Sequence, residues 1–156
     1  MKFHFILPIL LSLCSGNALA FSGQVIGISD GDTLTVLVDK KPIKIRIAEI
    51  DAPESKQPFG ARSKQSMSDL CFRSVADVVE VARDRYGRTV AKVNCGGQDV
   101  ATSQVRAGMA WVYDRYSRPD SPLYAEQAAA KDARRGLWAD KDPMAPWEWR
   151  RNKAAK

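Results

Sequence analysis

The segment from Ile43 to Ile47 alternates strictly between isoleucine and a basic residue. Successive side chains of a strand point to opposite faces, so three isoleucines share one face while Lys44 and Arg46 share the other. Pro53 has a fixed φ and no N–H to donate to a ladder, so Asp51-Ala52-Pro53-Glu54 breaks the strand. The pattern predicts a strand over 43–47 that is followed by an acidic loop.

The rest of the chain predicts four more strands and three helices. The expected strands are 24–28, 33–38, 43–47, 77–83 and 88–94, with turns at 39–42 and 84–87. The expected helices are 60–72, 99–107 and 121–135. Gly108 ends the second of these helices, and Gly136 follows the end of the third. Three strands, a helix, two strands and two helices suit a five-stranded barrel of the OB type with about three helices outside. This order indicates the α+β class and argues against a doubly wound sheet.

The first 20 residues have the features of a secretory signal peptide. They begin Met1-Lys2, run mostly apolar to Leu13 and end with an Ala-x-Ala pattern at Ala20. A membrane anchor needs about 20 apolar residues, more than this run supplies. A lipoprotein signal at Cys14 is a second interpretation, although such signals usually have a small residue before the cysteine. We expect cleavage after Ala20 and a secreted or periplasmic chain with no membrane association.

Charge and histidine content restrict the possible chemistry. The chain has 24 Lys and Arg, 18 Asp and Glu, and one histidine, at position 4. Removal of residues 1–20 leaves 136 residues (156 minus 20) and a formal charge of +5, because Lys2 is the one charged residue lost. A basic domain favours an acidic partner, and nucleic acid is the first candidate. Catalysis by a histidine triad and a histidine-rich metal site are both excluded.

Two cysteines, Cys71 and Cys95, remain after cleavage. An even number in an oxidising compartment favours a disulfide, which would add roughly 3 kcal/mol to stability on the chain-entropy model. Two buried free thiols are the alternative.

Charged residues concentrate in three short segments where predicted strands end. These are Ser29-Asp30-Gly31-Asp32-Thr33, Arg46 through Glu54, and Asp84-Arg85-Tyr86-Gly87-Arg88. Each segment alone is consistent with an ordinary turn, strand or loop. Together they supply Asp32 and Asp51 as hard oxygen donors for Ca²⁺ or Mg²⁺, with Glu54 nearby. They also supply the planar guanidinium groups of Arg46 and Arg88, which match phosphate oxygens. A phosphodiesterase requires this combination of groups.

The chain resembles the staphylococcal (micrococcal) nuclease family over about residues 23–140. The resemblance rests on Val25-x-x-x-x-Asp30-Gly31-Asp32-Thr33, Ile45-Arg46-Ile47-x-x-Ile50-Asp51-Ala52-Pro53-Glu54, Asp84-Arg85-Tyr86-Gly87-Arg88, Val105-Arg106-Ala107-Gly108 and Gly136-Leu137-Trp138. It implies a monomeric OB barrel and Ca²⁺-dependent endonucleolytic hydrolysis of DNA and RNA that leaves 3′-phosphate ends. The expected organisation is a signal peptide at 1–20, a nuclease domain at 21–140 and a tail at 141–156.

The resemblance also implies roles for individual residues. Asp32 and Asp51 match carboxylate ligands of the calcium ion, and Ala52 matches a backbone carbonyl ligand, at a position where the best-known member has threonine. Glu54 matches the general base or the residue that orients the attacking water. Arg46 and Arg88 match the pair that holds the phosphate and stabilises the transition state.

The resemblance is less clear for the substrate-stacking tyrosines. Tyr113 and Tyr116 lie in the segment that corresponds to these tyrosines, but Asp114 occupies one position between them. Tyr86 is a third stacking candidate, and each of the three is equally consistent with ordinary packing. Asp30 either supports the metal ligands or caps a turn. The Trp- and Arg-rich tail either stacks on nucleic acid or folds back onto the barrel.

Two other functions are alternatives to a nuclease. One is a non-catalytic OB-type module that binds nucleic acid, and the other is a basic anion-binding protein with incidental carboxylates. Degenerate members of the family usually lack several site residues, whereas this chain retains Asp32, Arg46, Asp51, Glu54 and Arg88. The sequence therefore favours the enzyme.

Overall fold

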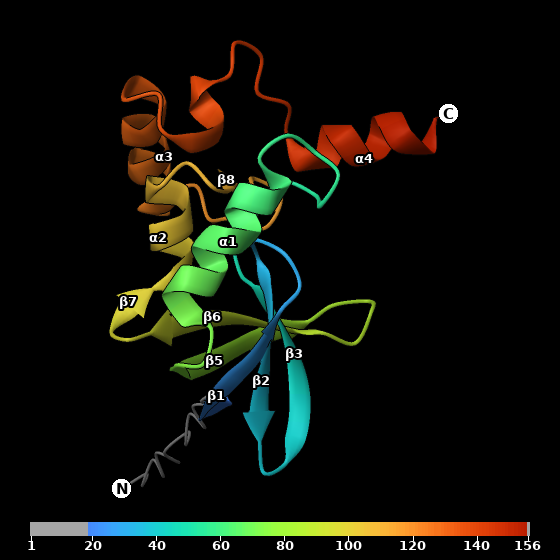
Figure 1. The fold of residues 1–156 in the computed structure, drawn as a ribbon, viewed down its shortest axis with the longest axis vertical. Helices are drawn as coiled ribbons and strands as arrows, with labels where there is room; N and C mark the ends of the chain where they lie inside the picture. The colour runs from blue at the N-terminus through green and yellow to red at the C-terminus, as the bar shows by residue number, and fades with distance from the viewer. Residues whose placement is uncertain (1–18, 156) are drawn as a thin grey trace, which may run out of the picture.

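The computed structural model describes residues 19–155 of the chain (Figure 1). The segment predicted as a signal peptide lies outside the described residues except for Leu19 and Ala20. Within residues 19–155, the helices are all too short or too polar to cross a membrane.

Five strands form a closed barrel. They are β1 (Ala20–Ile28), β2 (Thr33–Val38), β3 (Lys41–Ile47), β5 (Val75–Arg83) and β6 (Thr89–Cys95). Antiparallel pairing gives the order β3-β2-β1-β5-β6, and a parallel pairing of β3 with β6 closes the circle, with Arg46 opposite Val90. The predicted five-stranded OB-type barrel and the α+β class are confirmed.

Within the described residues, three two-residue strands and five helical segments complete the fold. The short strands are β4 (Ile50–Asp51), β7 (Gln98–Asp99) and β8 (Trp111–Val112). The helices are α1 (Gly60–Cys71), α2 (Val100–Arg106), α3 (Leu123–Asp132), the 3-10 helix η1 (Gly136–Ala139) and α4 (Pro146–Ala154). The expected number of about three helices omitted α4, because this helix has no continuous apolar stripe to indicate it. Pro146 in its first turn is its one clear start signal.

The boundaries differ from the expected ones where pairing extends an element. β1 begins at Ala20, not at residue 24, because its first five residues pair with β5. The turn expected at 39–42 is confined to Asp39 and Lys40, which have φ of 48° and 64°. Pro42 is therefore part of β3, opposite Leu37 and before the point at which β3 meets β6. A proline is tolerated there because this part of β3 is an edge.

The barrel interior is the main hydrophobic core. Its largest buried side chains include Leu34, Ile45, Ile47, Ile50 and Met67, the last from α1. Cys71 and Cys95 form the predicted disulfide, with a Cα–Cα distance of 5.3 Å, and join the end of α1 to the end of β6. The core and this bridge hold α1 against the barrel beside the loops that carry the predicted site residues.

Candidate active site

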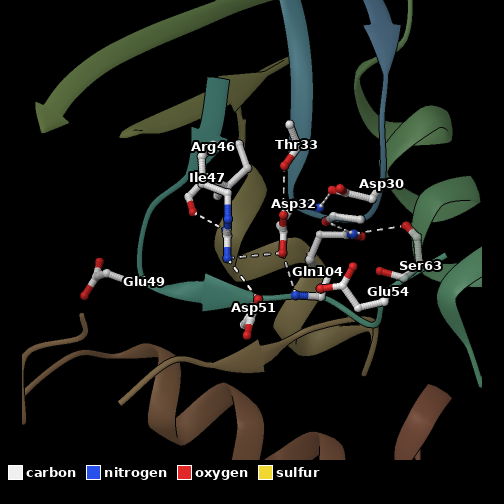
Figure 2. Close-up of polar contacts among 12 residues, drawn as sticks. Asp30, Asp32, Thr33, Arg46, Ile47, Glu49, Asp51, Glu54, Ser63 and Gln104 are labelled. Carbon is white, nitrogen blue, oxygen red and sulfur yellow. Dashed lines mark hydrogen bonds and ion pairs between the residues drawn. The ribbon is translucent and has the colours of Figure 1, made fainter. Parts of the chain in front are cut away.

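Two buried carboxylates lie close together where strands of the barrel end. Asp32 directly precedes β2 and is 5% exposed, and Asp51 ends β4 and is 2% exposed. Arg46 lies between them, with Nη2 3.3 Å from Asp32 Oδ2 and 3.1 Å from Asp51 Oδ1 (Figure 2). A buried carboxylate is costly unless it is paired, so the shared guanidinium stabilises both groups. The structure thus brings together three of the predicted site residues.

The turn before β2 is held by its own polar groups. The backbone N–H of Ser29 donates to the Thr33 carbonyl at 2.9 Å, and that of Asp32 donates to Asp30 Oδ1 at 3.0 Å. Asp30 therefore caps the turn, which is one of the two roles considered for it. Burial and the neighbouring charge of Asp32 raise the pKa of Asp30 to about 6.

Gly31 allows this turn to pack against α1. A side chain at Gly31 would overlap Ser63 Oγ, and its Cβ would lie 2.9 Å from the Cβ of Ala52. The buried Gln104 of α2 donates from Nε2 to the Gly31 carbonyl at 2.7 Å (Figure 2). Two helices thus fix the position of the turn and, with it, the position of Asp32.

Glu54 lies in the loop after β4. Its N–H donates to Gln57 Oε1 at 3.1 Å, and the Gln57 N–H donates to the Glu54 carbonyl at 2.8 Å. The Glu54 side chain is 43% exposed, in contrast to the buried side chain of Asp51 three residues earlier. A carboxylate with access to water beside the buried pair is suitably placed for a general base.

Arg150 of α4 binds the same carboxylates, a contact that no motif in the sequence predicts. Its Nη2 is 2.6 Å from Asp51 Oδ2, and its Nη1 is 3.2 Å from Asp51 Oδ1 and 2.7 Å from Glu54 Oε1. Burial acts against the charge of Arg150, but the bonds to these carboxylates raise the pKa of its guanidinium. Burial also raises the pKa of Asp51, more than its bond to Arg150 lowers it. The Trp- and Arg-rich composition of the tail was the available signal.

Arg88 occupies a different place from the other predicted residues. It lies in the turn between β5 and β6, where its Nε donates to Asp84 Oδ2 at 2.6 Å and its N–H donates to Asp84 Oδ1 at 3.0 Å. Over the described part of the chain, Arg88 makes no hydrogen bond or ion pair with Asp32, Asp51 or Glu54. The structure thus leaves Arg88 outside the cluster around Arg46.

The three predicted stacking tyrosines have different surroundings. Tyr86 is 69% exposed and lies under the guanidinium of Arg88, 5.6 Å from its carbon atom. Tyr116 is 65% exposed and contacts Tyr113 edge-on, with ring centroids 5.0 Å apart. The indole of Trp147 stacks on Tyr113 at 5.2 Å with an interplanar angle of 4°. The tail therefore folds back onto the molecule and covers Tyr113.

The donor set is chemically suited to a hard cation. Asp32 and Asp51 offer carboxylate oxygens, and Asp32 Oδ2 accepts from the Ala52 N–H at 2.6 Å, which brings the loop containing the Ala52 carbonyl next to the pair. In residues 19–155 no three His, Cys, Asp or Glu side chains converge on one metal position. A cation here would depend on two carboxylates, a backbone carbonyl and water. The guanidinium groups of Arg46 and Arg150 now supply the positive charge that the carboxylates require.

Comparison with known proteins finds relatives over most of the chain. Residues 44–140 match the family described as Staphylococcal nuclease homologue, a range that includes Arg46, Asp51, Glu54 and Arg88 but begins after Asp32. The chain is 45% identical to a micrococcal nuclease of Shigella flexneri over 141 residues, which are 84% of this chain and 81% of that protein.

Two further relatives carry the word endonuclease in their names. An uncharacterized endonuclease of Haemophilus influenzae is 47% identical over 130 residues, 82% of this chain and 72% of the relative. One of Escherichia coli is 40% identical over 150 residues, 94% of this chain and 97% of the relative. With its barrel and its carboxylate–arginine cluster, the chain belongs to the staphylococcal nuclease family.

Proposed function

We propose that the protein is a calcium-dependent endonuclease that hydrolyses phosphodiester bonds of DNA and RNA and leaves 3′-phosphate ends. The observation that carries the proposal is the buried Asp32–Arg46–Asp51 cluster with the exposed carboxylate of Glu54 beside it. Membership of a nuclease family and the names of the relatives support it. The positive charge of the chain suits a polyanionic substrate.

Asp32, Asp51 and the Ala52 carbonyl would hold the calcium ion. When bound, the ion would supply positive charge next to the scissile phosphate. Arg46 donates hydrogen bonds to the phosphate oxygens, and Glu54 orients the attacking water or accepts its proton. The bond from phosphorus to the 5′-oxygen breaks as the new bond to the water oxygen forms, the 5′-oxygen takes a proton from water or from an arginine, and the phosphate remains on the 3′ side.

Arg88 contributes a second guanidinium to the phosphate in this proposal. In the structure it is bonded to Asp84, in a turn with no close packing around Gly87. Exchange of Asp84 for a phosphate oxygen replaces one charge-assisted bond with another. The turn at 84–87 must therefore adjust when substrate binds.

We further propose that the protein acts after export, in the periplasm or the medium. The signal-like features of residues 1–20 support this, and so does the disulfide between Cys71 and Cys95, because disulfides persist in oxidising compartments. After cleavage behind Ala20, β1 would begin at Phe21 and keep four of its five pairings with β5.

The test incubates purified protein with single-stranded DNA in calcium, in magnesium and in chelator, and examines the product ends. Calcium-dependent cleavage with 3′-phosphate ends is the expected result. Glu54→Gln should reduce turnover about 10²- to 10⁴-fold without loss of folding. Glu49→Gln is the matched control, since the Glu49 carboxylate points away from the cluster (Figure 2).

Two results would contradict the proposal. Full activity of Glu54→Gln would exclude Glu54 as the base. Tight DNA binding without cleavage in any metal would assign the chain to the alternative class, a non-catalytic OB-type module that binds nucleic acid.

A further inference from the structure

The helix α4 lies directly on the groups that hydrolysis requires to be free. Its Arg150 bonds both carboxylate oxygens of Asp51 and also Oε1 of Glu54. These are the oxygens that a cation and the attacking water would contact. A guanidinium that makes three charge-assisted bonds is a strong competitor for them.

A second residue of α4 covers the predicted base-stacking surface. Trp147 stacks on Tyr113, with its ring plane tilted by 4°, and also meets Trp111 edge-on at 5.7 Å. A nucleobase stacks on a tyrosine in the same parallel arrangement. One short helix thus places an indole on the aromatic surface and a cation on the carboxylates.

The start of α4 is buried, whereas its later part is more exposed and is held by the bonds of Arg150. Ala145 is 3% exposed, Pro146 is buried, and Gln57 Nε2 donates to the Met144 carbonyl at 2.7 Å. Beyond this point Arg150 is 43% exposed, and Figure 1 shows α4 projecting from the molecule toward the C-terminus. Arg150 can therefore leave the carboxylates by movement of the later part of α4, whereas Trp147, next to the attached start, can leave Tyr113 by rotation of its own side chain.

We propose that α4 is an autoinhibitory helix, in which Arg150 competes with the cation for Asp51 and with the attacking water for Glu54, and Trp147 competes with a nucleobase for Tyr113. The cation part of this proposal rests on the function proposed above. Nucleic acid itself favours opening, because its phosphates offer Arg150 and the neighbouring Arg151 alternative anionic partners. The site is therefore exposed by its own substrate.

The first test measures calcium binding by titration calorimetry without nucleic acid. A helix that is closed for nine-tenths of the time weakens apparent affinity about tenfold, so Arg150→Gln should bind calcium about tenfold more tightly. Arg151→Gln is the control, because this substitution removes the same charge. Arg151 is 75% exposed and pairs with Glu148 of the same helix. The calcium affinity of this control variant should remain that of the unmodified protein.

The second test measures binding of labelled single-stranded DNA in chelator. Arg150→Gln should bind more tightly than Arg151→Gln, although both lose one positive charge. Trp147→Ala should also bind the DNA more tightly than the unmodified protein does. This variant leaves Asp51 and its partners intact. Circular dichroism checks that each variant is folded.

The results separate this proposal from the one on which it depends. If no protein binds calcium, the proposed cofactor is wrong, and the autoinhibitory helix is judged on DNA binding alone. If calcium binds but Arg150→Gln gains no affinity for calcium or DNA, α4 is not autoinhibitory. Loss of turnover in Arg150→Gln without any gain in affinity would instead make Arg150 a third phosphate-binding arginine and overturn the proposal.

Discussion

The side-chain amide of Gln104 donates a 2.7 Å hydrogen bond to the backbone carbonyl of Gly31, 73 residues earlier in the chain. Gln104 is fully buried and also donates to the Ser63 carbonyl at 3.2 Å, while its Oε1 accepts from Ser66 at 2.6 Å. Both the nitrogen and the oxygen of the amide therefore have hydrogen-bond partners. It connects α2, α1 and the turn that carries Asp32.

Replacement of Gln104 by Leu should lower the free energy of unfolding by about 2–3 kcal/mol, because it leaves the Gly31 carbonyl buried without a partner. Urea denaturation measures the change. Gln65→Ala is the comparison, since Gln65 is an exposed residue of α1 that bonds Asp69, and it should cost less than about 0.5 kcal/mol. A loss equally small for Gln104→Leu would show that this hydrogen bond does not fix the turn.

Gly31→Ala should also destabilise the protein, because the new methyl group overlaps the Ser63 side chain. Overpacking of this kind typically costs about 1–3 kcal/mol. Ser63→Gly removes the side chain that the new methyl group would overlap. The double variant should therefore lose less stability than the sum of the losses in the two single variants. Thermal unfolding of the four proteins provides the double-mutant cycle. Strict additivity would mean that the two residues do not meet.

The bond between Asp84 and Arg88 predicts a specific pH dependence. The small burial of Asp84 acts to raise its pKa, but the hydrogen bonds from Arg88 and the Tyr86 N–H outweigh it and hold the pKa below its usual value. A carboxylate with a lowered pKa stabilises the folded state at pH values above its unfolded-state pKa, which is near 3.8. This stabilisation is lost as the pH falls through the folded-state pKa. Asp84→Asn should thus be less stable than the unmodified protein at pH 5–7, and the difference should shrink below about pH 4.

Hydrogen exchange of the amides in the turn at 84–88 measures this effect locally. Protection should be lower in Asp84→Asn at neutral pH and equal in both proteins in acid. Asp120→Asn is a matched control, since Asp120 also pairs with a nearby arginine, Arg118, in an exposed loop. Faster exchange in the 84–88 turn in that variant would mean that the effect is not local.

Reduction of the disulfide should lower stability by about 3 kcal/mol, on the model in which the bridge restricts the unfolded chain. Cys71 and Cys95 are each 1% exposed, so a folded protein should require partial unfolding before dithiothreitol reacts. The double variant Cys71→Ala/Cys95→Ala should show the lower stability with or without the reductant. Equal urea midpoints for the oxidised and reduced protein would contradict this expectation.

Most of the barrel could be predicted from local sequence, because strict alternation in 43–47 and β-branched runs such as 33–38 indicate strands directly. The positions of Asp32, Arg46 and Asp51 followed from the ends of those strands. The two-residue strands β4 and β8 were missed because they have no pattern of their own and exist only through their mutual pairing, Ile50 with Val112 and Asp51 with Trp111.

The sequence could not predict how arginines are distributed around the site. Arg88 was expected near the carboxylates, but Asp84, four residues away, is a local partner that costs little chain entropy to reach. Arg150 lies 99 residues from Asp51, and no periodicity or spacing connects them. Such a contact depends on how the whole chain packs.

The closure of the barrel has a consequence for the order of events in folding. The pairing of β3 with β6 joins residues 44 positions apart, such as Arg46 and Val90, so the closure of this seam costs more chain entropy than the closure of a hairpin. The β2–β3 hairpin alone already joins the segments of Asp32 and Asp51, because Thr33 pairs with Arg46 and the Ile47 N–H donates to the Asp32 carbonyl at 2.8 Å. A chain that lacks the seam leaves the other edge of β3 unpaired beside Arg46, so the complete centre is held in place only in the closed barrel. If the chain is exported unfolded, as the proposed export requires, its complete centre would form only when the barrel closes after translocation.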